Sequence, residues 1–428
     1  MMTISPPVAK WCLVAVVALN CESPHGRCQE VTLWEHQRLP WKVISGGEGS
    51  GVYKSTDGGT TWNKMQNGLP KEMGKMAITV SRANSEKVYA LIESDFTKEA
   101  GGMYVSENAG KTWSHATSDH RIIGRAWYYI EVFADPIIEN TLYVMNAPAL
   151  KSTDGGKTWE NISSTHGDYH NLWINPSNSN NMIIADDGGA AVTFNGGKSW
   201  SSQNIYATAQ FYRINVDNEF PYNVYGGMQD NGSWAGPAYT WRVQGIRNSY
   251  WQEISFGDGF DVLPDPDNSR FGISASQQGS AVIYDRLTGY NEGIRPTHPE
   301  REEKLRFNWN AAMNRDPFHS NTLYFGSQFV HKSTDGGQTW DIISEDLTTN
   351  NPDYQKQGES GGLTVDATGA ENYCTILVIE PSPIQKGLLW IGTDDGQVNV
   401  SLNGGNDWQN ITTNIPMPTG AWINQIRA

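Results

Sequence analysis

The sequence predicts an all-β protein, a β-propeller of about seven to eight four-stranded antiparallel blades with Asp-box turns. Three observations predict this fold: a repeated turn motif, a repeated pair of apolar strands, and a near absence of helical periodicity along 428 residues. We expect two parts. Residues 1–40 form a signal-like or non-native N-terminal segment, and residues 41–428 form the propeller, either as a complete ring or as a fragment of a larger multi-bladed protein.

The N-terminal segment begins with a short apolar run. Lys10 precedes the run 11–19, which is too short to span a bilayer but has the length of the apolar core of a signal peptide. Asn20 stands just before Cys21, where a lipoprotein signal needs a small residue. Although this cleavage site is poor, the apolar run leads us to expect an exported protein, periplasmic, cell-surface or extracellular. The alternative is an incorrect start, with residues 1–40 outside the native structure.

The turn motif is an octapeptide of the form S/T-x-D/N-x-G-x-S/T/D-W, which occurs six times. Asp-Gly and Asn-Gly favour tight turns because glycine accepts positive φ and the Asx side chain accepts hydrogen bonds from the turn amides. The closing Trp starts the next strand and offers an apolar face to a neighbouring sheet. We assign a structural role to the Asx residues, which are Asp57, Asn108, Asp154, Asn195, Asp335 and Asn403.

A second pattern alternates with the octapeptide: an apolar strand, a turn with Pro, and a second apolar strand. Residues 129–136 followed by 141–144 are one example. Together the two patterns make a four-stranded unit of about 40–45 residues, the size of a propeller blade. They predict blades at 76–118, 125–163, 169–204, 210–249, 254–295, 305–346 and 371–412. Residues 41–65 are a partial blade, which we expect residues 422–427 to complete as its innermost strand.

Composition excludes several classes of function. The net charge of −15 disfavours binding to nucleic acid and to anionic lipid, and no apolar stretch beyond the first 40 residues is long enough for a membrane span. Four cysteines cannot support a disulfide scaffold, and Cys374 opens an apolar strand, which is typical of an inert buried thiol. The chain has neither a Gly-x-Ser-x-Gly nucleophile motif nor a phosphate-binding loop, and we expect no cofactor.

The chain resembles the Asp-box (bacterial neuraminidase repeat) superfamily, and within it the sortilin-like bacterial propellers often labelled glycosyl hydrolases. Besides the octapeptides, the resemblance rests on residues 125–136, 166–174, 207–212, 220–231 and 369–375. It covers about residue 50 to the C-terminus. Such propellers include receptors, assembly factors, structural modules and glycosidases, so the resemblance implies the fold and not one function. Relatives of this type usually carry further blades on both sides.

Propeller geometry predicts where a site lies. The octapeptides connect the third and fourth strands of their blades, so we expect a functional funnel on the opposite face, where second-to-third-strand loops and interblade linkers meet. Polar residues converge there, and we expect ligand contacts from His166, Asp168, His170, Asp186, Asp187, Gln229, Asp230 and Asn231. Trp234 and Trp251 belong to an aromatic cluster that is either a stacking platform for a ligand or packing between blades.

A glycosidase needs two carboxyl groups across a cleft, about 5–5.5 Å apart for retention or about 6.5–9.5 Å for inversion. Asp187 and Asp230, on adjacent blades, are the candidate catalytic pair, although both stand in sequences that also form ordinary turns. A sialidase is excluded, because residues 212–215 read Tyr-Arg-Ile-Asn without the required Pro and lie in a strand. The pattern His166-x-Asp168-x-His170 could hold Zn or Cu, but structural histidines are favoured and we predict no metal.

The first hypothesis is thus an exported propeller that binds an extracellular peptide, protein or glycan in the funnel opposite the octapeptides, with no nucleic acid and no membrane span. The alternatives are a glycoside hydrolase that uses paired Asp residues and a scaffold segment of a multi-propeller protein. Paired carboxylates at a suitable separation favour the enzyme, and a closed, dry channel favours the scaffold.

Overall fold

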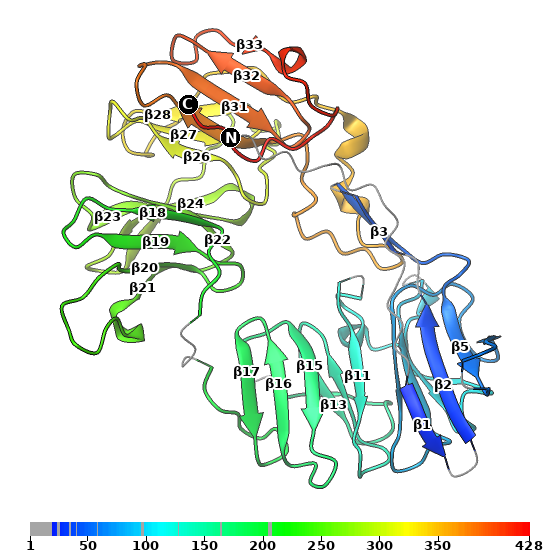
Figure 1. Cartoon of the computed structure of the whole chain (residues 1–428). Helices are drawn as coiled ribbons and strands as arrows, with labels where there is room; N and C mark the ends of the chain where they lie inside the picture. The colour runs from blue at the N-terminus through cyan, green and yellow to red at the C-terminus, as the bar shows by residue number, and fades with distance from the viewer. Residues whose placement is uncertain are drawn as a thin grey trace. The chain divides into compact units, whose positions relative to one another are not determined.

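The computed structural model describes residues 19–23, 26–33, 36–39, 41–57, 59–95, 98–126, 128–162, 165–203 and 208–428. They fall into two compact units. The N-terminal unit holds the described residues between Lys10 and Tyr206 together with Gly358–Ala367, and the C-terminal unit holds Ala207–Gln357 and Thr368–Ala428. Apart from the two-stranded hairpin β3–β4, each unit contains four antiparallel sheets that follow one another along the chain (Figure 1). The fold is a β-propeller.

The N-terminal unit contains the sheets β1-β2-β5-β6, β7–β10, β11–β14 and β15–β17, of which the last has three described strands. A separate hairpin joins β3 to β4. The strands of the N-terminal unit are β1 (Leu19–Ser23), β2 (Gly26–Leu33), β3 (His36–Leu39), β4 (Lys42–Ser45), β5 (Gly51–Ser55), β6 (Asn63–Met65), β7 (Met76–Val80), β8 (Val88–Ile92), β9 (Gly102–Ser106), β10 (Ser114–Thr117), β11 (Glu131–Ala134), β12 (Leu142–Met145), β13 (Ala149–Ser152), β14 (Glu160–Asn161), β15 (Tyr169–Ile174), β16 (Met182–Asp186) and β17 (Gly189–Thr193).

The C-terminal unit contains four sheets of four strands, each in sequence order: β18–β21, β22–β25, β26–β29 and β30–β33. Its strands are β18 (Arg213–Val216), β19 (Asn223–Gly227), β20 (Ser233–Pro237), β21 (Gln252–Ser255), β22 (Gly259–Pro264), β23 (Phe271–Ser276), β24 (Ser280–Asp285), β25 (Tyr290–Gly293), β26 (Met313–Arg315), β27 (Leu323–Gly326), β28 (Val330–Ser333), β29 (Asp341–Ile342), β30 (Ile376–Pro381), β31 (Leu389–Thr393), β32 (Val398–Ser401) and β33 (Gln409–Asn410).

Helical structure is confined to short 3-10 turns in the part of the chain that the structure describes. These are η2 (His120–Ile122), η3 (Asn248–Tyr250), η4 (Gln277–Gly279), η5 (Pro352–Tyr354), η6 (Gln357–Glu359) and η7 (Thr412–Asn414). None of the helices in those residues has the length and hydrophobicity that crossing a membrane requires. The prediction of an all-β propeller with about eight blades is confirmed.

The core lies between successive blades. Leu91 of β8 and Leu142 of β12 share one fully buried cluster, and Ile273 of β23 and Phe325 of β27 share another. Burial of a side chain of this size contributes about 1.5–3 kcal/mol. Small residues allow the closest approaches, since a Cβ on Gly227 of β19 would lie 2.1 Å from the carbonyl carbon of Gly259 at the start of β22. Each blade is therefore held mainly by its neighbours.

Each octapeptide forms the turn between the third and fourth strands of its blade, or follows the third strand in the sheet β15–β17. In the turn after β13, the Ser152 hydroxyl donates to Asp154 at 2.8 Å and accepts from the Gly156 amide at 2.9 Å. Gly156 has a φ of 88°, a region open to glycine at little cost. We call the end of the sheets that carries these turns the octapeptide face of each unit, and the other end the opposite face.

Two predicted details of the blades are wrong. The blade predicted at 210–249 extends to β21 at Gln252–Ser255, so the next blade starts at Gly259 and not at 254. The reason is that this blade has no octapeptide, and residues 238–251 form a long loop where a tight turn would otherwise join β20 to β21.

The second error concerns the partial blade at 41–65. Strand β5 pairs with β2, so residues 19–33 supply the strands that 422–427 were expected to provide. Residues 421–428 form no strand and instead lie on the last blade, where Ile423 and Ile426 pack with Val378 and Val398. These two apolar side chains are covered there without strand pairing. The predicted leader role of residues 1–40 stays a prediction.

Candidate functional site

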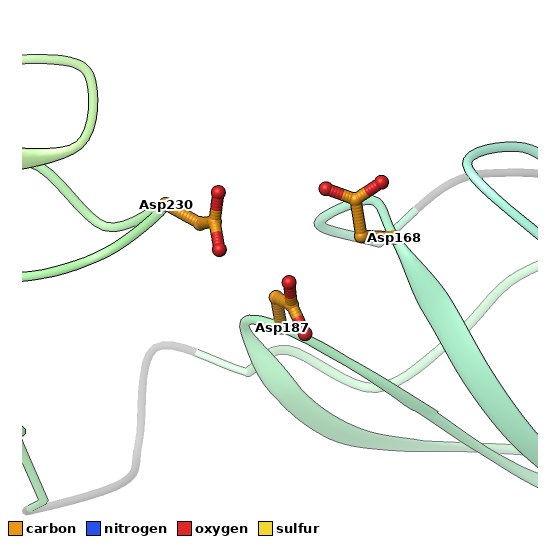
Figure 2. Close-up of side chains that lie close together, drawn as sticks. All are labelled: Asp168, Asp187 and Asp230. Atoms are coloured by element: carbon orange, nitrogen blue, oxygen red, sulfur yellow. The ribbon is translucent and has the colours of Figure 1, made fainter. Parts of the chain in front are cut away.

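Five side chains gather on the opposite face of the N-terminal unit: Tyr128, Tyr129, Asp168, His170 and Asp187. We call them the β15 cluster. Asp168 immediately precedes β15, His170 lies on β15, and Asp187 lies in the turn between β16 and β17. The two aspartates are drawn in Figure 2, and one carboxylate oxygen of Asp168 lies within 4.8 Å of one of Asp187. Asp168 thus lies in the predicted linker and Asp187 in the predicted second-to-third-strand turn, whereas His170, also expected in the linker, lies on β15.

Asp168 binds a buried tyrosine. The Tyr129 hydroxyl donates to the Asp168 carboxylate, and the ring of Tyr129 is 5% exposed. Burial and this hydrogen bond to an anion raise the pKa of Tyr129 well above its usual range, so the phenol keeps its proton. Asp168 has a φ of 52°, in the left-handed region that non-glycine residues enter at a cost and that recurs at functional sites.

His170 binds Asp187. The imidazole Nε2 lies 2.8 Å from Asp187 Oδ1, with the His170 side chain 39% exposed and that of Asp187 22% exposed. The His170 ring lies 4.6 Å from the ring of Tyr129 and 6.1 Å from that of Tyr128, measured between centroids. The cluster thus presents a phenol ring, an imidazole and two carboxylates that solvent reaches in part.

A segment distant in sequence supports the cluster. Asp366, in Gly358–Ala367, forms an ion pair with Arg125, whose Nε lies 2.9 Å from Asp366 Oδ2, and the Arg125 guanidinium lies 6.0 Å from the Tyr128 ring centroid. The same segment is held by Glu93, which is fully buried and accepts from the Thr364 amide and hydroxyl at 3.1 and 3.0 Å. Sequence reasoning missed Asp366 because no pattern links it to residues 125–187.

Two other predicted residues in this unit have structural contacts. Asp186 is 8% exposed and accepts from the Thr165 hydroxyl at 2.5 Å and the Gln203 amide at 2.7 Å. His166 packs on Gly188, where an added Cβ would lie 2.5 Å from its own. These contacts fix the turn that carries Asp187. Among the described residues, His166, Asp168 and His170 do not form a three-ligand cluster, and neither unit by itself contains one.

The predicted residues of the C-terminal unit lie in the loop between β19 and β20. Gln229 accepts from the Tyr212 hydroxyl at 2.5 Å, and Asn231 accepts from the Trp234 indole through its backbone carbonyl at 2.7 Å. The Asp230 amide donates to Asp258 at 2.8 Å. Asp230, like Asp168, has a positive φ, here 58°.

Asp230 and Asp187 belong to different units, so their pairing stays a prediction. Asp258, by contrast, is 7% exposed within its own unit, and burial raises its pKa. Trp251 stacks on Phe211 with centroids 6.1 Å apart, and a Cβ on Gly236 would lie 2.3 Å from its ring. This contact favours the packing alternative for Trp251.

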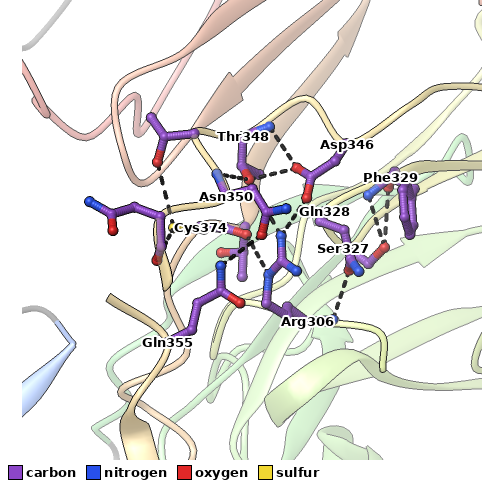
Figure 3. A network of polar contacts seen from close by, with 12 residues as sticks. Arg306, Ser327, Gln328, Phe329, Asp346, Thr348, Asn350, Gln355 and Cys374 are labelled. Atoms are coloured by element: carbon purple, nitrogen blue, oxygen red, sulfur yellow. Dashed lines mark hydrogen bonds and ion pairs between the residues drawn. The ribbon is translucent and has the colours of Figure 1, made fainter. Parts of the chain in front are cut away.

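Buried carboxylates elsewhere in this unit join loops to blades. Asp394 is fully buried and accepts from Thr375 and Asn308, and burial raises its pKa to about 7. Figure 3 shows a second network, in which Arg306 binds Asp346 at 2.6 Å. Arg306 also donates to the backbone carbonyl of Cys374, whose thiol is buried with a pKa raised to about 11 by burial. The predicted burial of this thiol is confirmed.

Comparison with known proteins identifies no family for this chain. No protein-family model and no curated protein matches the chain. Similar solved structures include the GH74 enzyme of Niastella koreensis, with 14% identity over 87% of this chain and 67% of that chain and a TM-score of 0.30. Others are the GH74 xyloglucanase of Xanthomonas campestris (13%, 93% and 54%, TM-score 0.29) and YCF48 of Cyanidioschyzon merolae (13%, 82% and 88%, TM-score 0.25). At these identities and TM-scores, the similarities support no statement about the function of this chain.

Proposed function

We propose that this chain is an exported, sortilin-like propeller of the Asp-box superfamily that binds a glycan or peptide at the β15 cluster. The observation that carries the proposal is the assembly of Tyr128, Tyr129, Asp168, His170 and Asp187 at one strand end, with partial exposure. Acceptor oxygens dominate this assembly, so it favours ligands rich in donors, which are the hydroxyls of a glycan or the ammonium and amide groups of a peptide. Tyr128, 41% exposed, offers a ring face for stacking.

The two pairs within the cluster prepare it for binding. Tyr129 orients Asp168 and His170 orients Asp187, so neither carboxylate has to be ordered when a ligand arrives. Preorganisation of this kind increases affinity by lowering the entropy that binding costs. The Arg125–Asp366 ion pair holds the neighbouring segment beside Tyr128.

Glycoside hydrolysis is the second candidate. One observation favours it: a carboxylate oxygen of Asp168 lies within 4.8 Å of one of Asp187, and glycoside hydrolysis needs two neighbouring carboxyl groups. On this reading Asp168 and Asp187 are the carboxyl pair, and Asp187 is the nucleophile or base candidate. Asp187 with Asp230, the pair expected from sequence, is an alternative for the same reaction.

A binding screen followed by two substitutions tests the proposal. The purified chain is applied to glycan and peptide arrays, and hits are measured by calorimetry with Asp187→Asn, His170→Gln and the control Asp353→Asn. Asp353 is an exposed carboxylate paired with Lys356, so the control removes the same charge elsewhere. We expect the first two variants to weaken binding about tenfold or more, as loss of a charge-assisted hydrogen bond does, with the control unchanged.

Equal affinity in all variants would place the ligand site elsewhere. Chromogenic glycosides separate the two functions: release of the chromophore by the parent and its loss in Asp187→Asn would establish the hydrolase, and binding without release would establish the receptor.

A further inference from the structure

A groove lies on the octapeptide face of the C-terminal unit. It has a volume of about 880 Å³ and opens between the blades β26–β29 and β30–β33. Its wall is built from the turn between β26 and β27, the turn between β30 and β31, and the octapeptides of both blades. The lining includes His319, Thr322, Lys332, Thr334 and Lys386. We call it the interblade groove, and it is distinct from the β15 cluster in unit and in face.

Two ammonium groups line the groove. Lys332 Nζ lies 6.0 Å from the ring centroid of Tyr324, and Lys386 Nζ lies 3.2 Å from His319 Nε2. Within the described part of the chain, neither ammonium has a carboxylate within 4.0 Å. The lining of the groove thus carries two ammonium groups and one carboxylate, in a chain whose net charge is −15.

The one carboxylate in the lining is already used. Asp316 is 7% exposed and accepts from the amides of Phe318 and His319 at 2.9 and 3.0 Å and from the Tyr324 hydroxyl at 3.0 Å. Its Oδ1 also lies 3.2 Å from His319 Nδ1. Burial opposes ionisation, but these hydrogen bonds outweigh it and hold the pKa of Asp316 below its usual range. Asp316 therefore shapes the turn and leaves the lysines without a partner carboxylate.

The blade β11–β14 provides an internal comparison for the groove, because it has some of the same residues as the blade β26–β29 but not all of them. It has the same three residue types at the corresponding positions, Asp135, Tyr143 and Lys151, and the Lys151 ammonium lies 5.6 Å from the Tyr143 ring centroid. At the position of His319 it has Ile138. The next blade there supplies a serine hydroxyl, 2.6 Å from the Asp135 carboxylate, instead of an ammonium. The Asp–Tyr–Lys arrangement is thus common to both blades, and the imidazole and second lysine are additions.

We propose that the interblade groove binds an anionic saccharide, with Lys332 and Lys386 contacting its acidic group. Two ammonium groups recognise a carboxylate, phosphate or sulfate, and the remaining polar lining, which includes the hydroxyls of Thr322 and Thr334, suits sugar hydroxyls. The volume lies within the range of about 300–1,000 Å³ that accommodates small ligands. The shared chemistry is an oxyanion on a hydroxylated ring, whether a uronate or a sugar phosphate.

Calorimetry with matched ligands and variants tests this proposal. The probes are glucuronate, glucose 6-phosphate, glucose and inorganic phosphate, titrated into the full chain and into Lys386→Gln, Lys332→Gln and the control Lys151→Gln. Lys386 is exposed in a turn, so its variant should fold even if Lys332→Gln disturbs the packing on Tyr324. Melting temperatures confirm that each variant is folded.

We expect at least one acidic sugar to bind, glucose to bind too weakly to measure, and affinity to fall as salt rises. Lys386→Gln should weaken binding about ten- to a hundredfold, the range for loss of a charge-assisted hydrogen bond, and Lys151→Gln should leave it unchanged. The proposal is overturned if no acidic sugar binds, if glucose or inorganic phosphate binds as tightly as the acidic sugar, or if the Lys151 variant loses as much affinity as the Lys386 variant. None of these outcomes bears on the β15 cluster, whose variants are tested separately.

Discussion

Asp154→Ala should destabilise the blade β11–β14 through a small number of identifiable hydrogen bonds. Asp154 accepts from the Ser152 hydroxyl at 2.8 Å, from the amides of Lys157 and Thr158 at 3.0 Å each, and from the Thr158 hydroxyl at 2.6 Å. The other octapeptides provide the matched control, because Asn stands at this position in three of them: Asn108, Asn195 and Asn403. Asp154→Asn should therefore keep the turn.

The expected loss in the free energy of unfolding depends on how exposed this turn is. A net hydrogen bond contributes about 0.5–1.5 kcal/mol, but water can replace the lost acceptor for the exposed amides of Lys157 and Thr158. The Ser152 hydroxyl loses an acceptor in a position that is 1% exposed. We expect a loss of about 1–2 kcal/mol for Asp154→Ala, similar to the loss of a helix N-cap, and less than about 0.5 kcal/mol for Asp154→Asn.

Hydrogen exchange read by mass spectrometry is the appropriate assay, because unfolding of a chain with two units need not be two-state. The peptide that contains the Lys157 and Thr158 amides should exchange faster in Asp154→Ala and at the parental rate in Asp154→Asn. The dependence of stability on pH provides a second test. Hydrogen bonds led by those from Thr158 outweigh burial and lower the pKa of Asp154 to about 2, below an unfolded value of about 3.9. The parent should therefore lose the stabilisation as pH falls from about 4 to about 2, and the Asn variant should lack this step.

Parental exchange rates in Asp154→Ala would refute the reasoning, since the two amides would then not depend on the carboxylate. Equal acceleration in the Ala and Asn variants would also contradict it, because it would show that the negative charge matters and the acceptor geometry does not.

Two further predictions concern buried carboxylates. Glu93→Ala should cost about 3–5 kcal/mol, because a fully buried acceptor of four hydrogen bonds is lost, and should accelerate exchange and proteolysis within Gly358–Ala367; slow exchange there would show that other contacts hold the segment. Asp394→Asn should flatten the dependence of melting temperature on pH: burial raises the Asp394 pKa to about 7, above the unfolded value of about 3.9, so its contribution is greatest below about pH 4 and declines up to about pH 7, and an unchanged slope would contradict this.

The sequence by itself determined the repeating parts of this protein. Each octapeptide is a local structure, since Ser152, Asp154 and Gly156 satisfy one another within five residues, and local turns are readable from spacing. The Pro-containing turn between apolar strands is local as well. Together they predicted the all-β propeller and the face on which Asp168 and Asp187 lie. Two blades have no octapeptide, β18–β21 and β22–β25, and the predicted boundary between them was wrong.

Only the tertiary structure decided which polar residues share a site. Asp168 meets Tyr129 because adjacent blades bring a linker and the start of a strand together, and Asp187 meets His170 because the pairing of β15 with β16 brings a strand and a turn to the same end of one sheet. Asp366 arrives from more than two hundred residues away, held by a segment that no repeat pattern marks. Such contacts depend on how blades pack against each other, and packing is set by the summed burial of many side chains, which no short stretch of sequence encodes.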